Sequence, residues 1–161
     1  MKEDVIKLIT FTLAGEVFAI PVEEVERVLR FVEPAVVPDA PAAVMGVVED
    51  AGRIVPVVDL RSRFSIEPQI GHSDRRIVIV QTAAGPVGVV VDSVLEVAAR
   101  PSRTIQPPPS VLRGLPGRLL HGFVPSDGAS PLIMILDANN VLSSTDRFAF
   151  ERSLHEGSPH G

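Results

Sequence analysis

The sequence predicts a mainly β protein made of two small β-barrels packed on each other. Hydrophobic residues make up 45% of the 161 residues and aromatic residues only 4%, so the core is mostly aliphatic. Val and Ile occur in runs, and β-branched side chains pack well on a pleated sheet. Four features also recur in the same order at an offset of about 70 to 78 residues. This order indicates an internal duplication.

The first recurring feature is a strand. Residues 15–20 (GEVFAI) match residues 85–90 (GPVGVV), and each segment is typical of a buried strand. Two spaced valines follow each strand and predict a short helical turn: Val25 and Val28 in the first half, Val94 and Val97 in the second. In the first half, residues 21–29 combine an apolar face with an early proline and early acids, so we expect an amphipathic helix there.

Prolines and hairpins form the second and third features. Pro38 and Pro41 correspond to residues 107–109 (PPP), and proline suits extended crossing segments because its φ is fixed and it lacks an N–H group. Residues 44–48 and 120–124 are largely apolar, and turn-forming residues follow both. Each is therefore the first strand of a predicted hairpin.

The return strands are the fourth feature. Residues 54–59 and 132–137 are nearly continuous apolar runs that end in Asp59 and Asp137, and Asp92 follows a similar run. A carboxylate at such a position caps the next turn or takes part in catalysis, and we expect capping. The alternative from another functional class is a small hydrolase or ligand-binding β-barrel that uses Asp59, Asp92 or Asp137. Two of these carboxylates converging in a pocket would support it.

The repeat sets the expected domain organisation. Each half has about 65 residues, which is enough for a small closed barrel. We expect a single domain over residues 1–150, with the first barrel at about 16–66 and the second at about 72–148. The N-terminal strand, residues 5–14, is assigned to the second barrel, although the sequence alone fits either. Residues 151–161 have the composition of a disordered tail.

Composition argues against several functional classes. The net charge is −5, and no basic cluster is interleaved with aromatic residues, which argues against nucleic acid as a partner. Cysteine is absent, and the four histidines lack metal-ligand spacing, so we expect no metal and no cofactor. No nucleophile, base and orienting group stand out together, which predicts a protein that is not an enzyme. The charged N-terminus lacks an apolar stretch, so we expect a cytoplasmic protein without direct membrane insertion.

Several short motifs carry a resemblance to a known family. Residues 52–61 read GRIVPVVDLR, residues 87–94 read VGVVVDSV and residues 105–107 read IQP. Over roughly residues 5–148, the chain is similar to CheW, the adaptor of bacterial chemotaxis arrays, and to the regulatory domain of the kinase CheA. The resemblance implies two five-stranded SH3-like barrels around a shared core, with short helices.

The resemblance also implies a function and a set of site residues. Such a protein would be a non-catalytic adaptor or scaffold that couples a methyl-accepting chemoreceptor to a CheA-type histidine kinase, with recruitment to receptor arrays. Its partners would be the cytoplasmic receptor tip and the regulatory domain of the kinase. By position, the receptor-binding groove between the barrels would include Val25, Arg27, Ala51, Ile77, Gly88 and Val97. The kinase-binding surface would lie on the first barrel near Val22 and Gly46.

Two of these positions depart from the family pattern. Most members have an acidic residue where this chain has Arg27, and an Asn-Leu-Arg-Gly turn where it has residues 49–52 (EDAG), which include Ala51. Because charge complementarity sets partner choice, our hypothesis is an adaptor with a divergent receptor-binding surface. The alternative within the binding class is a single-partner array modulator that binds the kinase or the receptor but not both.

Overall fold

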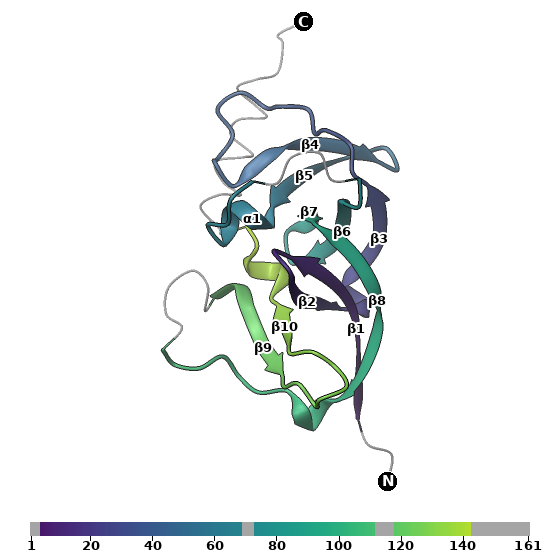
Figure 1. Cartoon of the computed structure of the whole chain (residues 1–161). Helices are drawn as coiled ribbons and strands as arrows, with labels where there is room; N and C mark the ends of the chain where they lie inside the picture. The colour runs from purple at the N-terminus through teal and green to yellow at the C-terminus, as the bar shows by residue number, and fades with distance from the viewer. Residues whose placement is uncertain (1–3, 69–72, 112–117, 143–161) are drawn as a thin grey trace, which may run out of the picture.

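The computed structural model describes residues 4–68, 73–111 and 118–142, so the predicted tail at 151–161 lies outside the described residues. These residues form two five-stranded sheets, seen one above the other in Figure 1. With η for a single 3₁₀ turn, the elements are β1 (Val5–Leu13), β2 (Glu16–Pro21), η1 (Val22–Glu24), β3 (Val25–Arg30), β4 (Val44–Asp50), β5 (Arg53–Asp59), α1 (Leu60–Arg63), β6 (Arg76–Thr82), β7 (Gly85–Val91), β8 (Ser93–Pro101), η2 (Ser102–Thr104), β9 (Leu120–Val124), β10 (Ile133–Leu136) and η3 (Ala138–Asn140).

The two sheets have the same strand order, related by the internal duplication. The first sheet runs β3-β6-β7-β5-β4 and the second runs β8-β1-β2-β10-β9. Exchanging each strand for its counterpart in the other half of the chain converts one order into the other. Each sheet also has one parallel pair, β5 with β7 and β10 with β2. The predicted mainly β fold with duplicated halves is therefore confirmed.

The expected allocation of strands to barrels was wrong in part. The range 16–66 was expected to form the first barrel, yet β2 pairs with β1 and β10 in the second sheet. The range 72–148 was expected to form the second, yet β6 and β7 pair with β3 and β5 in the first. The other strands lie where expected: β3, β4 and β5 in the first sheet, and the N-terminal strand with β8, β9 and β10 in the second. Each half thus exchanges its first hairpin with the other half, and an apolar run fits either sheet equally well.

Apolar side chains form three clusters, one for each sheet and one between them. One cluster lies within the first sheet and the chain segments next to it. Another lies within the second sheet and its neighbouring segments. The largest draws on both sheets and contains Phe11 and Phe18, whose stacked rings lie 5.9 Å apart between centroids, together with Val78 and Val89. The expected shared core between two barrels is therefore present.

The predicted helix over residues 21–29 is wrong. Only residues 22–24 form a single 3₁₀ turn, and β3 begins at Val25. A bulge adds one residue to β3 at this point. Val25 and Val28 are three residues apart, but their partners on β6, Val80 and Val78, are only two apart. β8 has the same bulge. Val94 and Val97 are three residues apart, but their partners on β1, Phe11 and Ile9, are only two apart. The three-residue valine spacing that resembled a helix therefore comes from a β-bulge in each strand.

Crossing segments pass over the barrels at two glycines. Ala35 pairs with β4 through two backbone hydrogen bonds of 2.8 and 2.9 Å, and Gln106 pairs with β9 through two of 2.8 Å. A Cβ on Gly46 would lie 2.2 Å from the carbonyl oxygen of Ala35, and one on Gly122 would lie 2.8 Å from that of Gln106. These glycines are needed for the close backbone approach, and the predicted crossing segments are confirmed.

Candidate functional site

The six residues predicted for the receptor-binding groove divide into surface and core. Four reach the surface: Val25 and Arg27 on β3, Ala51 in the β4–β5 turn, and Val97 on β8. Ile77 is fully buried in the cluster of the first sheet. A Cβ on Gly88 would lie 2.9 Å from the Ile77 side chain, so Gly88 provides the space that Ile77 fills. These two residues shape the barrel from within.

Arg27 belongs to a chain of four alternating charges. Its Nη1 donates to Oδ1 of Asp50 at 3.1 Å, and Arg53 Nη2 lies 3.5 Å from Oδ2 of the same carboxylate. Arg53 also donates to both oxygens of Glu26, at 3.3 and 2.6 Å. The Asp50 side chain is nearly buried, at 5% exposure, whereas that of Arg27 is 53% exposed. The network is therefore balanced in charge and presents the Arg27 guanidinium to solvent.

This charge network closes the first barrel. β3 and β4 are the two edges of the first sheet, and the pair between Arg27 and Asp50 joins them. The hydrogen bond from Arg53 lowers the pKa of Glu26, and the same bond raises the pKa of Arg53. The unusual cation at Arg27 thus has its counter-charge in the neighbouring turn, which also departs from the family pattern.

Apolar side chains are exposed along the two edge strands β3 and β8, which lie on the same side of the molecule in Figure 1. Leu95 and Val97 on β8 are 52% and 57% exposed, and Val28 on β3 is 39% exposed. At the start of the strands, Val25 and Val94 both pack against the shared core, so the strands converge where the barrels meet. We call this the seam surface, which comprises Val25, Arg27, Val28, Leu95 and Val97.

The two residues predicted for the kinase-binding surface lie in different settings. Val22 is in η1, which contacts both β1 and β6, so it lies where the two barrels join and not on the first barrel alone. Gly46 is buried in β4 beneath the crossing segment at Ala35. Gly46 therefore supports the shape of the first barrel, while Val22 has atoms within reach of a partner.

The three aspartates that follow apolar strands hold local structure. Asp59 accepts a hydrogen bond from the backbone N–H of Arg61 at 2.9 Å, and Asp137 accepts one from that of Asn139 at 3.1 Å, which caps α1 and η3. Asp92 accepts one from the backbone N–H of Ala14 at 2.8 Å. The capping interpretation is confirmed for Asp59 and Asp137, whereas Asp92 holds the distant β1–β2 turn, and nothing in this geometry favours the hydrolase alternative.

Asp92 also forms the most enclosed ion pair described. The Nε and Nη2 atoms of Arg61 donate to its two oxygens at 2.9 and 2.6 Å, and both side chains are mostly buried. This bond raises the pKa of Arg61. Because Asp92 also holds the β1–β2 turn at Ala14, the pair joins α1 of the first half to a hairpin of the second sheet.

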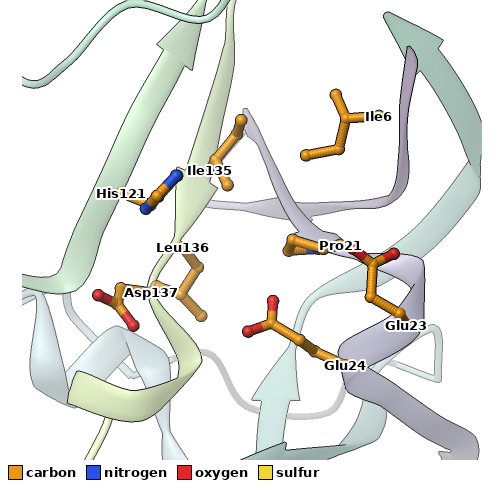
Figure 2. Close-up of a pocket in the computed structure, with 8 residues that line it drawn as sticks. All are labelled: Ile6, Pro21, Glu23, Glu24, His121, Ile135, Leu136 and Asp137. Carbon is orange, nitrogen blue, oxygen red and sulfur yellow. The ribbon is translucent and has the colours of Figure 1, made fainter. Parts of the chain in front are cut away.

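A hollow of about 350 Å³ opens beside η1 (Figure 2). Its apolar walls come from Ile6, Pro21, Ile135 and Leu136, and its polar side chains are Glu23, Glu24, His121 and Asp137. In Figure 2, Glu24 points across the opening towards β10, with His121 and Asp137 on the far side, whereas the Glu23 carboxylate lies beside Pro21. Burial, followed by repulsion from Asp137 and Glu23, raises the pKa of Glu24, while His121 acts in the opposite direction.

Several of these groups escaped sequence reasoning. Asp50 lies within the turn that was singled out as unusual, but its pairing with Arg27 follows only from the strand order. His121 was interpreted as structural, and its place opposite Glu24 has no signal in the sequence. Within residues 4–68, 73–111 and 118–142, no group of three or more potential ligands is arranged for a metal. In the same residues, no helix is long and apolar enough to cross a membrane.

Comparisons with known proteins agree with this geometry. The family model of the CheW-like domain matches residues 7–146. The chain is 28% identical over 150 residues to Chemotaxis protein CheW of Treponema pallidum (strain Nichols), covering 91% of this chain and 87% of that protein. It is 34% identical over 134 residues to Protein FrzA of Myxococcus xanthus, covering 83% and 82%. Its fold is similar to the crystal structure of the scaffolding protein TtCheW from Thermoanaerobacter tengcongensis, with a TM-score of 0.80, 27% identity, and coverage of 89% and 96%.

Proposed function

This chain belongs to the CheW-like domain family, and from that premise we propose that it is a non-catalytic adaptor that couples a chemoreceptor to a CheA-type histidine kinase. It works in the cytoplasm, at receptor arrays. The observation that carries the proposal is the seam surface, an apolar strip on two repeat-related edge strands of a chain with this fold.

The seam surface is the receptor-binding groove in this proposal. Leu95 and Val97 are apolar side chains of β8 that are more than half exposed, and burying such side chains at an interface contributes affinity. The cytoplasmic tip of the receptor is the partner that the family resemblance implies. Charged groups on the flank, above all Arg27, then decide which receptor binds.

The charge at Arg27 supports a divergent receptor preference. Its guanidinium is half exposed and is held in place by Asp50. A receptor with an acidic side chain opposite Arg27 gains a charge pair, whereas one with a basic side chain there meets repulsion. Ala51 lacks any side chain that could contribute a compensating charge. The receptor that this adaptor serves therefore carries an acid at the matching position.

The kinase-binding surface includes Val22 in this proposal. Val22 lies in η1 beside both barrels and has partial exposure, which suits an apolar contact at the edge of an interface. Gly46 contributes indirectly, because its backbone keeps the crossing segment at Ala35 against β4.

Calorimetric titration at moderate salt tests this function. The full chain is titrated with the regulatory domain of the CheA-type kinase and, separately, with the cytoplasmic tip of a receptor from the same organism. Micromolar binding to both is expected. Val97→Glu should weaken receptor binding by about tenfold or more, because it places a charge in the centre of the apolar strip. The control is Val36→Glu, at a position that is 81% exposed on a crossing segment.

The two arms separate the proposal from its rivals. Binding to the kinase without any receptor would identify a single-partner array modulator. Failure to bind the kinase regulatory domain at high concentration would refute the adaptor proposal. Equal losses in Val97→Glu and Val36→Glu would refute the seam surface as the receptor site.

A further inference from the structure

The hollow beside η1 borders a second hollow. This second hollow, of about 400 Å³, shares Ile6 and Glu23 with the first and continues along Val5 and Val22. Val5 is 53% exposed, so the second hollow offers apolar surface beyond the first. We call the two hollows together the η1 groove. The two adjoining hollows offer more room than a small ion fills, which suits a side chain and its neighbours in a polypeptide.

The charges of the η1 groove are distributed unevenly. Three carboxylates, those of Glu23, Glu24 and Asp137, lie around the first hollow together with His121, whereas the second hollow has Lys7 beside the shared Glu23. An occupant with a positive charge at the first end and none at the second therefore fits best.

Glu24 is the group that lacks compensation. Among the described residues, its carboxylate has no hydrogen bond or ion pair. The neighbouring Asp137 carboxylate already accepts hydrogen bonds from Asn139 and Asn140 in η3. The raised pKa of Glu24 has the same cause, since burial and the nearby acids disfavour its charge. A cation in the hollow would relieve this repulsion.

We infer that the η1 groove receives an extended segment of a partner protein whose arginine side chain enters the first hollow. The guanidinium lies between the η1 glutamates and Asp137, and its methylene groups cover Pro21 and Ile135. Arginine suits the site better than lysine, because a planar group with several donors reaches carboxylates on two opposite walls. Apolar residues next to the arginine then cover Val5 and Val22. This surface is separate from the seam surface but shares Val22 with the proposed kinase-binding surface, so the inference is tested with a peptide and without the kinase, and the two can fail separately.

Peptide titration by NMR tests this inference on the full chain. The probe is the tripeptide acetyl-Val-Arg-Val-amide, and its matched control replaces arginine with the neutral isostere citrulline. We expect saturable shifts at His121 and Ile6 with the arginine peptide, and binding about tenfold or more weaker with the citrulline peptide. The pKa of the Glu24 carboxyl, followed through its ¹³C resonance, should fall when the arginine peptide is bound.

Two variants locate the binding. Glu24→Gln should weaken the arginine peptide by about tenfold, whereas Glu49→Gln, which removes one negative charge from the exposed β4 edge, should leave its affinity unchanged. The spectrum of each variant shows whether its fold is intact. Equal binding of the two peptides, equal loss in the two variants, or no saturable shift would overturn the inference. Tighter binding of spermidine than of the arginine peptide would also overturn it, since the groove would then hold a small free cation.

Discussion

Arg27 and Asp50 join the two edge strands of the first sheet through an ion pair of 3.1 Å between Nη1 and Oδ1. The pair closes a barrel and also presents a cation at the surface, which in the proposed function selects the receptor. Its two members are unequal, because the carboxylate is nearly buried and the guanidinium is half exposed. Loss of one member therefore has a different consequence from loss of the other.

Asp50→Asn should lower the free energy of unfolding by about 1 to 3 kcal/mol, because two arginines then face each other without their shared, nearly buried counter-charge. Arg27→Ala should cost about 1 kcal/mol or less, because water screens the half-exposed partner. Urea unfolding of both variants measures the difference. A larger loss in Arg27→Ala than in Asp50→Asn would contradict this account of the network.

The pair between Arg61 and Asp92 should matter more for stability. Arg61→Ala should lower the free energy of unfolding by about 2 to 4 kcal/mol, since it takes the paired guanidinium away from a mostly buried carboxylate. Arg61→Lys should restore only part of this loss, because an ammonium group cannot bind both oxygens in parallel. Denaturant unfolding of the three proteins gives the order. Full recovery in Arg61→Lys would show that charge alone, and not the two-point geometry, stabilises the contact.

Gly46→Ala should destabilise the first barrel by about 1 to 3 kcal/mol, because the new Cβ would meet the rigid backbone oxygen of Ala35. The comparison is Gly15→Ala, where nothing lies within 4 Å and only a left-handed φ of 82° opposes the substitution. Thermal unfolding of both variants should show the larger loss at Gly46. Similar losses would indicate that the crossing segment moves aside at little cost.

Local patterns were sufficient to predict the class of the fold. Apolar runs ending in Asp59 and Asp137 and the prolines of the crossing segments recur in both halves, so the duplication is readable from the sequence. The exchange of hairpins is not readable, because β2 and β7 are apolar enough to fit either sheet. The bulges in β3 and β8 leave only a three-residue valine spacing, which also fits a helix, because the register against β6 and β1 is what distinguishes the two.

The site could be predicted only in outline. Arg27 and the turn at Ala51 stand out when the chain is set beside its family, so the unusual charge was found. Its partner Asp50 becomes evident only when the two edges of the first sheet meet. The groups of the η1 groove are further still from prediction, because Glu24 and His121 lie in different halves of the chain and are joined only by the fold.

Glu24→Gln should stabilise the protein at neutral pH and leave its stability unchanged in acid. The pKa of Glu24 in the fold lies above its ordinary value of 4.5, so the folded state keeps a proton that the unfolded chain has lost. Stability contributed by this group therefore decreases as pH rises from about 4.5 through the folded pKa, and glutamine has no such dependence. Urea unfolding at several pH values should show no difference near pH 3 and a growing advantage of Glu24→Gln above pH 4.5. An advantage that is constant across this range would mean that packing, and not the carboxylate charge, causes it.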